Sequence, residues 1–494
     1  MSDGKVVFRG SLINYGSFLL AKLAIFGSTV VLARLLVPRQ FGIVGYALLV
    51  LGFLYVLKNF GMGTALIYGQ GLTEEQAGVL FYVAVLASIV SVVIAWAAAP
   101  SIATFFHDHR IVAVTRVLSF SLVLNALAEL HNAQLQKRMR FGRRAVPLLA
   151  SSVAKGAAAI GFAAAGLGYW SLVWGQLVGD GVFAVVCWAL YPWFPRLSRG
   201  RWAEVSHLLR FGMNVAFLEV VALLLLNVDN LVVGRTRGTT SLGMYDLAFT
   251  IPQMISIGLA GAISQAVFPV LATMQADVER LRERYFTVLR YVALIMFPLG
   301  AGLSVVAPSF VRSFYGRAWW PMIPAARALA LYAMVFAIGW GIADVHQALG
   351  RPDRQWRLDL VHLALLTPAV VIGVHVGGIT GVAWAQVVVV VPLLAVRLWV
   401  VARALDIPAS RIVEALRVPA AGGAALYLVC ASFALATERT LGPVALLACQ
   451  VALGVTIYGA VVAPAVLKSA GPIGRHAPSQ DRGGSTAPIR AVRG

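Results

Sequence analysis

The stretch AELHNAQLQKRMRFGRR, Ala128–Arg144, ends a long apolar run with an acid, a histidine, amides and five basic residues. A later stretch, ADVHQALGRPDRQWR at Ala343–Arg357, repeats the same order of residue types. An apolar run that ends in Lys and Arg is typical of a membrane helix that leaves the bilayer on the cytoplasmic side. The two stretches together therefore indicate a membrane protein with an internal repeat.

The composition supports a membrane location for most of the chain. Of its 494 residues, 60% are hydrophobic and 12% are charged, and the mean hydropathy is +0.83. A soluble protein carries roughly a quarter charged residues. Continuous apolar runs such as Ala77–Ala99 and Leu441–Leu467 are long enough to cross a bilayer as helices, whereas a membrane barrel would show short alternating strands. The fold class predicted is an all-α polytopic membrane protein.

Fourteen helical spans are predicted. They lie at residues 10–36, 42–60, 77–99, 111–133, 145–166, 169–191, 207–233, 243–268, 286–307, 322–347, 356–377, 379–402, 415–436 and 441–467. The first run has no A-x-A cleavage site and carries Lys22 in its middle, so we expect it to remain as a span. Every second connection is rich in Lys and Arg, which predicts that both termini are cytoplasmic.

Three pairs of matching segments indicate a duplication. They are Ala128–Ala133 with Ala343–Ala348, Trp174–Val178 with Trp384–Val388, and Arg34, Gly42 and Ala47 with Arg235, Gly243 and Ala248. A repeat of six spans gives both halves one orientation, as in transporters whose substrate path runs between two parallel repeats. The predicted parts are an N-lobe at 1–200, a C-lobe at 201–405, two additional spans at 406–468, and a disordered basic cytoplasmic tail at 469–494.

Charged residues inside the predicted spans are candidates for function, because a charge at the bilayer centre costs about 2.5–3.5 kcal/mol. Lys22 lies midway along the first span, and no acid shares its helix face. A cation on a cavity wall suits an anionic group, particularly phosphate. The predicted substrate-binding residues are Lys22, Lys155, Tyr15 and Asn14.

A second set of residues is predicted to couple or gate transport: Glu129, Asp344, Glu219, Asp180 and Arg351. Each has a plainer interpretation. Lys155 and Asp180 could form a structural ion pair between consecutive spans, and Glu129 and Asp344 could pair with Lys137 and Arg351 at the cytoplasmic ends. His131 and His346 are more typical of interfacial histidines than of proton relays.

Several classes of function are disfavoured by what the chain lacks. Its +20 charge is spread between apolar runs and forms no basic patch, which argues against nucleic-acid binding. The three cysteines have no motif spacing, and nucleotide-binding, zinc-protease and nucleophile-elbow motifs are absent, so neither a cofactor nor a metal is predicted. Short outer connections disfavour a membrane glycosyltransferase or polymerase. An ion-coupled drug or cation antiporter stays open because of Asp180 and Glu219.

Several motifs resemble a known family: LARLLVPRQFGIVGYA, NFGMGTALI, LQKRMRFGRRA, GLGYWSLVWGQL, DNLVVGRTRGTTSLGMYDLA and ALGRPD. They are similar to those of Wzx-type polysaccharide-unit flippases, in the multidrug/oligosaccharidyl-lipid/polysaccharide exporter superfamily. The resemblance implies two six-helix bundles plus a helix pair. It also implies export of undecaprenyl-diphosphate-linked oligosaccharides across the bacterial inner membrane for capsule, exopolysaccharide or O-antigen synthesis, beside a polymerase and an export complex.

The resemblance also carries an expectation for the site. Related lipid flippases hold the diphosphate in a cationic central cavity, and Lys22 and Lys155 match that role here. The second lobe offers Glu219 where another cation is expected. Either fewer groups contact the phosphates than in the related flippases, or Glu219 carries a coupling proton instead.

Overall fold

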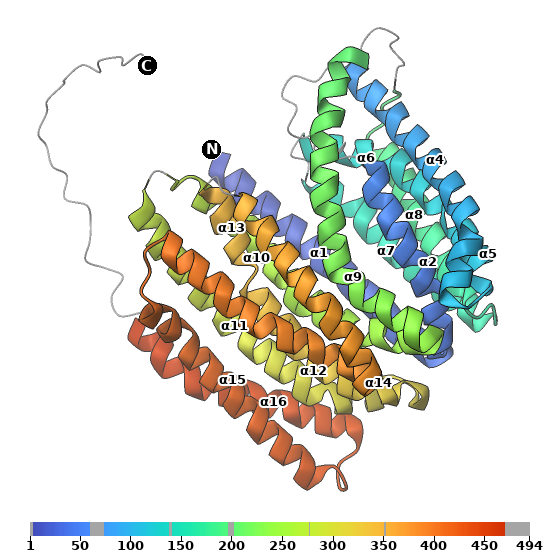
Figure 1. The fold of residues 1–494 in the computed structure, drawn as a ribbon. Coiled ribbons are helices and arrows are strands. Elements are labelled where there is room, and N and C mark those ends of the chain that lie inside the picture. Colours follow the sequence, from blue (N-terminus) through green and yellow to red (C-terminus); the bar gives the residue numbers. More distant parts are fainter. Residues whose placement is uncertain are drawn as a thin grey trace, which may run out of the picture.

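The computed structural model describes residues 3–59, 74–137, 141–195, 202–275, 277–349 and 352–469. Within these ranges the chain is helical, with no strand, which confirms the predicted all-α class (Figure 1). Most of the predicted tail lies outside the described ranges.

The N-terminal group of helices comprises residues 3–190. Its members are α1 (Asp3–Leu35), α2 (Pro38–Asn59), α4 (Glu74–Phe106), α5 (Arg110–Leu118), α6 (Phe120–Lys137), α7 (Phe141–Ala164) and α8 (Trp170–Leu190). These helices follow the predicted spans closely, because each apolar run needs its backbone groups hydrogen-bonded inside the bilayer. The fourth predicted span is divided at Ser119 into α5 and α6.

The C-terminal group comprises residues 202–404, followed by two more helices. Its members are α9 (Trp202–Pro252), η1 (Gln253–Ile257), α10 (Gly258–Ala272), α11 (Val278–Phe314), η2 (Arg317–Met322), α12 (Ile323–Ile338), α13 (Gly341–Ala348) and α14 (Pro352–Ala404); α15 (Ala409–Thr437) and α16 (Pro443–Ser469) complete the chain. Two of these helices contain a break. Gly238 in α9 has a φ of 77°, and Gly378 in α14 has a φ of 58°, a region that favours glycine.

Eleven helices among the described residues are long and apolar enough to cross a membrane. Two of them, at Glu219–Phe268 and Arg354–Ala404, contain the glycine breaks and so comprise two predicted spans each. The first predicted span lies in α1, which is not among the eleven. A many-span helical architecture is confirmed, and the exact number of fourteen stays a prediction.

Helix packing separates the chain into two groups (Figure 1). In the N-terminal group α7 packs on α1 and α8, and in the C-terminal group α12 packs on α11 and α14. The main contact between the groups is α2 along α9, while α15 and α16 pack on α11. On this basis we propose that the groups are the two predicted lobes, with α15 and α16 as an added pair.

Long-range contacts show which connections lie at the same end of the helices. Arg282 donates to the carbonyl of Leu405, and Arg411 pairs with Glu283 at 2.7 Å, so two basic connections lie together at what we term the basic end. At the opposite end, Arg312 pairs with Glu438. The chain therefore sorts its alternate connections to two ends, as the charge pattern predicts.

Candidate functional site

Lys155 is held where three helices of the N-terminal group approach closely. A Cβ atom at Gly156 in α7 would lie 2.8 Å from the Cβ of Ser28 in α1, and one at Gly179 in α8 would lie 2.7 Å from the Cβ of Lys155. Glycines at both positions let the backbones approach, as small residues do in membrane helix packing. The Lys155 side chain is consequently fixed between α1 and α8.

Gln176 links the two opposite charges of this site. The Lys155 Nζ donates a hydrogen bond to the Gln176 Oε1. The Gln176 Nε2 in turn donates to both carboxylate oxygens of Asp180 at 3.0 Å. Lys155 and Asp180 are therefore joined through an amide, so Lys155 keeps charge that Asp180 does not neutralise directly.

Lys155 and Gln176 face a cavity of about 190 Å³ at the junction of the two groups of helices. Its wall combines α1, α2, α7 and α8 with residues 246–250 of α9. Asp246 lines it from the C-terminal group, and its side chain is exposed. The cavity thus presents a cation, an amide and a carboxylate among apolar side chains, which suits a ligand with both an anionic group and hydroxyl groups.

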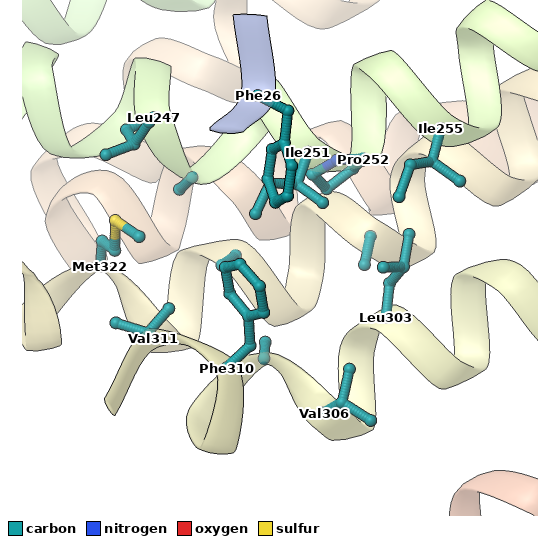
Figure 2. A pocket seen from close by; sticks show the side chains of 14 residues that line it. Phe26, Leu247, Ile251, Pro252, Ile255, Leu303, Val306, Phe310, Val311 and Met322 are labelled. Atoms are coloured by element: carbon teal, nitrogen blue, oxygen red, sulfur yellow. The ribbon is translucent and has the colours of Figure 1, made fainter. Parts of the chain in front are cut away.

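A second cavity, of about 250 Å³, is lined in part by the same segment of α9 (Figure 2). It is lined by apolar side chains of α1, α9, η1, α11, η2 and α12, including Phe26, Ile251, Phe310 and Met322. Leu247 lines both cavities. A polar cavity and an apolar cavity therefore adjoin across one side chain.

The two groups of helices touch at the opposite end through a pair of repeat-equivalent glycines. A Cβ atom at Gly42 would lie 1.8 Å from the carbonyl oxygen of Thr239, and one at Gly243 would lie 2.0 Å from that of Pro38. Neither position has room for a side chain. The sequence match of Gly42 with Gly243 therefore has a structural reason, since α2 and α9 meet there symmetrically.

Repeat-equivalent arginines cross this contact in opposite directions. Arg34 of α1 donates to the carbonyls of Ser313 and Phe314 at the end of α11, at 2.7 and 2.8 Å. Arg235 of α9 lies 3.1 Å from the Nδ1 of His107, just after α4. An arginine of each group therefore contacts the other group, and these contacts hold the two groups together at the opposite end.

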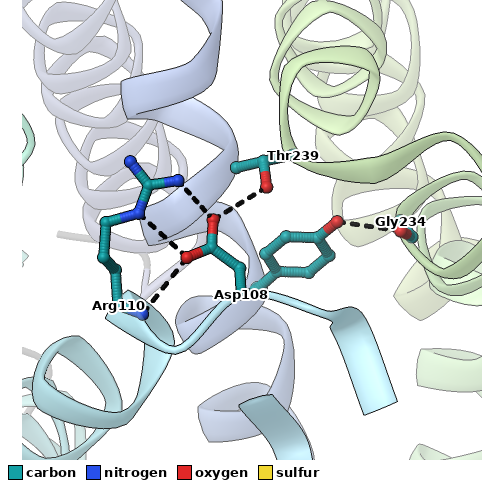
Figure 3. Close-up of polar contacts among 5 residues, drawn as sticks. Asp108, Arg110, Gly234 and Thr239 are labelled. Atoms are coloured by element: carbon teal, nitrogen blue, oxygen red, sulfur yellow. Dashed lines mark hydrogen bonds and ion pairs between the residues drawn. The ribbon is translucent and has the colours of Figure 1, made fainter. Parts of the chain in front are cut away.

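Asp108 adds a polar contact at the same end (Figure 3). Its carboxylate accepts hydrogen bonds from Arg110 at 2.7 and 2.9 Å and from the Thr239 hydroxyl of α9 at 3.1 Å. Burial alone would raise the pKa of Asp108, but these hydrogen bonds and the Arg110 charge bring that pKa below its ordinary value. Nearby, the Tyr46 hydroxyl donates to the carbonyl of Gly234 at 2.8 Å.

Gln386, the repeat counterpart of Gln176, lies in a closed polar network inside the C-terminal group. Its Nε2 donates to Asp229 at 2.6 Å, and the Tyr245 hydroxyl donates to the same oxygen at 2.8 Å. Asp229 and Tyr245 are fully buried, and Gln386 is 2% exposed. This network joins three spans and lines neither of the two cavities.

The predicted gate acids are each bonded inside their own group. Glu129 lies 3.6 Å from the Nζ of Lys58 on α2, a partner other than the predicted Lys137. Asp344 accepts a hydrogen bond from Ser264 of α10 at 2.7 Å. In both groups the acid therefore joins the fourth span to the second, by an ion pair in one and a neutral donor in the other.

The remaining predicted residues fall in different places. Lys22 is half-buried on α1, one turn before Phe26, and its charge acts on that of Lys155. Glu219 is exposed on α9, apart from both cavities. The side chains of Asn14 and Tyr15, and all of Arg351, lie outside the part of the chain that the structure describes.

Residues that sequence reasoning missed include Asp246, Asp229 and Lys58. Asp229 and Asp246 both stand in the motif DNLVVGRTRGTTSLGMYDLA, and their position within the apolar pattern of spans was the available signal. Lys58 ends an apolar run and has the appearance of an ordinary cytoplasmic flank. Nothing in its own segment points to the distant Glu129.

The known proteins that this chain resembles in sequence share names from polysaccharide biosynthesis. A family model described as polysaccharide biosynthesis protein matches residues 31–324. The teichuronic acid biosynthesis protein TuaB of Bacillus subtilis is 24% identical over 78% of this chain and 80% of its own length. The lipopolysaccharide biosynthesis protein WzxC of Escherichia coli is 26% identical over 71% and 72%, and the succinoglycan biosynthesis transport protein ExoT of Rhizobium meliloti is 24% identical over 63% and 64%.

Solved structures share the fold. The lipid II flippase MurJ in an inward closed conformation superposes with a TM-score of 0.76 over 94% of this chain and 99% of its own, at 16% identity. An inward-facing multidrug resistance MATE family transporter gives a TM-score of 0.63 over 80% and 99%, at 17% identity.

Proposed function

This chain belongs to the polysaccharide biosynthesis protein family, and we propose that it is a flippase that moves a lipid-linked oligosaccharide between the leaflets of a membrane. The observation that carries the proposal is Lys155, a cation inside a membrane protein that faces a cavity between the two groups of helices. A charge inside the bilayer needs a partner, and the hydrogen bond that Lys155 donates goes to a neutral amide, Gln176. An anionic lipid headgroup is the ligand that fits.

The polar cavity is proposed to hold the phosphates and the first sugars. Lys155 would donate to a phosphate oxygen, with Lys22 adding positive charge from α1. Asp246, from the other group, would accept hydrogen bonds from sugar hydroxyls. Because these residues come from both groups, the substrate would contact both lobes at once.

The apolar cavity is proposed to accept the start of the lipid chain. It adjoins the polar cavity at Leu247, and its wall holds few polar atoms (Figure 2). A lipid-linked sugar has this same division, with an apolar chain attached to its phosphate. The rest of the chain would stay in the bilayer, since its transfer into an aqueous path would cost about 0.8 kcal/mol per CH₂ group.

Transport is proposed to proceed by alternating access of the two lobes. The contacts at the opposite end, Gly42 with Gly243 and the crossed Arg34 and Arg235, would have to break for release. Glu129 and Asp344 would keep each lobe rigid, because each is bonded inside its own group. A membrane potential of 100 mV supplies only about 2.3 kcal/mol per charge, so these contacts must be weak enough to exchange.

The lipid carrier and the membrane are proposed as follows. The substrate would be an undecaprenyl-diphosphate-linked repeat unit in the bacterial inner membrane, with the basic end and both termini in the cytoplasm. A polysaccharide polymerase and an export complex would take the product. The support is the family, whose relatives are named for the biosynthesis of teichuronic acid and lipopolysaccharide and for transport in succinoglycan biosynthesis.

Two other functions receive less support. An ion-coupled drug antiporter is not favoured, since the named relatives serve polysaccharide biosynthesis. Coupling roles for Asp180 and Glu219 remain compatible with a flippase and are proposed only as such. A membrane glycosyltransferase is disfavoured by relatives that include a biosynthesis transport protein.

The test is a deletion strain from which lipid-linked oligosaccharides are extracted. Complete repeat units that accumulate where a membrane-impermeant glycosidase cannot reach them are the expected result. Single units that are exposed outside and never lengthened would instead indicate a polymerase. Unchanged lipid-linked sugars would contradict the proposal.

A further inference from the structure

A third cavity lies at the basic end, between α11, α15 and α16, away from both cavities described above. Its volume is about 340 Å³, and it is lined by Phe286, Arg290, Glu414, Ala415, Arg417, Val418 and Ala465. The two arginines come from different helices, so the site is assembled by the tertiary packing of α15 and α16 on α11. No role assigned so far uses it.

The charged groups of this cavity are available to a ligand. Arg290 is half-buried, and its single hydrogen bond among those described, 3.3 Å to the carbonyl of Ala465, is long. Arg417 is exposed, and no hydrogen bond or ion pair to it is found within the described ranges. Two guanidinium groups at one cavity provide a forked set of donors that matches the oxygens of a phosphate.

The rest of the wall is apolar. Phe286, Ala415 and Val418 face the cavity beside the arginines, and Ala415 is 2% exposed. A soluble anion such as inorganic phosphate would gain nothing from this surface. A ligand with a charged headgroup and an apolar chain would contact both the arginines and the apolar wall.

The surroundings place this cavity against lipid. α15 and α16 carry a large exposed apolar surface: Val413, Leu428, Leu435, Val444, Val451 and Val455 are each more than half exposed. In a membrane protein such a surface faces acyl chains. The arginines stand at the basic end of that surface, where the headgroups of one leaflet would lie.

We propose that this cavity binds the headgroup of an anionic phospholipid, with Arg290 and Arg417 on the phosphodiester. Glu414, a carboxylate at the rim, accepts hydrogen bonds from headgroup hydroxyls. It therefore favours a hydroxylated, singly charged headgroup such as phosphatidylglycerol over phosphatidic acid. The bound lipid ties α15 and α16 to α11 at a place remote from the transport path.

The experiment measures thermal unfolding of the purified full chain in detergent as phosphatidylglycerol or phosphatidylcholine is added. Phosphatidylglycerol should raise the Tm in a saturable manner, and phosphatidylcholine should not. In the Arg290→Gln/Arg417→Gln variant the apparent affinity should fall about 30-fold, at roughly 1 kcal/mol for each basic residue near a membrane surface. Glu414→Gln should reduce the preference for phosphatidylglycerol over phosphatidic acid.

The matched control is Arg280→Gln/Arg284→Gln, which removes the same charge from the same end of α11 but outside the cavity. An equal loss of affinity in this control would reduce the effect to net charge and overturn the proposal. Stabilisation by glycerol phosphate alone, at the concentration of lipid that suffices, would show a site for a free anion and would also overturn it. Poor folding of the double variant is addressed by Arg417→Gln alone, whose exposed side chain supports no described contact.

Discussion

Gln176 and Gln386 occupy matching positions in the two repeats, but they have different partners and different roles. Gln176 bonds a lysine and an aspartate beside an open cavity, whereas Gln386 bonds Asp229 in a network that is closed to solvent. The cation in the first site is what makes the difference, because it leaves positive charge directed at a cavity. Duplication thus supplied two equivalent amides, of which one serves a binding site and the other holds helices together.

This comparison separates two energetic roles. A buried polar network stabilises the fold when all its members are bonded, and removing one member leaves others unsatisfied. A charge beside a cavity adds little to stability and is retained for its ligand. Substitutions beside the cavity should therefore mainly reduce export, and substitutions in the buried network should mainly reduce the free energy of unfolding.

The largest expected effect is on export when the cation is removed. Lys155→Met keeps most of the length of the side chain and deletes the charge, so export should fall about 10- to 100-fold, the worth of a charge-assisted hydrogen bond. The measurement is the turnover of lipid-linked oligosaccharide in a complemented deletion strain. Lys155→Arg serves as the matched control and should retain part of the activity. Full export by Lys155→Met would remove the basis of the comparison.

Next comes stability in the other repeat. Gln386→Ala should lower the free energy of unfolding by about 1–3 kcal/mol, because Asp229 stays fully buried with one hydrogen bond fewer. Thermal unfolding in detergent measures this loss, with export normalised to folded protein. Gln176→Ala is the paired variant and should lose export in addition to stability, because Lys155 and Asp180 lose the amide that joins them beside the cavity. An exchange of these two phenotypes would show that the roles are assigned the wrong way round.

A smaller effect is expected where the groups of helices meet. Gly42→Ala places a methyl group 1.8 Å from the Thr239 carbonyl oxygen, so α2 and α9 must separate at the opposite end. A cysteine at Ala33, which is 1% exposed, should then react with a maleimide at least about fivefold faster, a typical coupling magnitude.

The control for that variant is Gly52→Ala, whose methyl group meets only Leu223 at 3.9 Å. It should leave the labelling rate unchanged. Both variants are made with the exposed Cys449 replaced by serine. Equal rates in Gly42→Ala and Gly52→Ala would mean that the glycine contact does not close the opposite end.

The smallest effect is a pH dependence of the same end. The lowered pKa of Asp108 means that its contribution is complete above the ordinary Asp value and is lost as the pH falls through the folded pKa. Because maleimides react with the thiolate, the Ala33→Cys labelling rate is divided at each pH by the rate for a short cysteine peptide. This ratio should be flat from about pH 7 to 5 and rise only below about pH 4. Asp108→Asn should remove the acid limb of the curve. A rise centred near neutral pH would assign the switch to a group other than Asp108.

Much of the architecture could be predicted from the sequence because the bilayer imposes a length and a polarity on every span. The continuous apolar runs predicted where the helices lie, and the basic connections predicted which helix ends lie together. The match of Gly42 with Gly243 also marked the contact between the groups, although its meaning needed the distance to Thr239.

The site was predicted less completely, for a physical reason. Lys155, Gln176 and Asp180 are on adjacent helices, so their association follows from sequence order and helix periodicity. Asp246 lines the same cavity from the C-terminal group of helices. Lys58 of α2 forms an ion pair with Glu129 of α6, a helix distant from it in the sequence. Such partners depend on how the helices rotate and pack, which hydropathy does not determine.

The most direct test of the central claim is binding of undecaprenyl diphosphate to the purified protein, followed by native mass spectrometry. The account predicts that the wild type and Gln386→Ala bind this lipid with similar affinity and that Lys155→Met binds it at least about tenfold more weakly. Equal binding by the wild type and by Lys155→Met would contradict the claim that the cavity of the first repeat holds the headgroup.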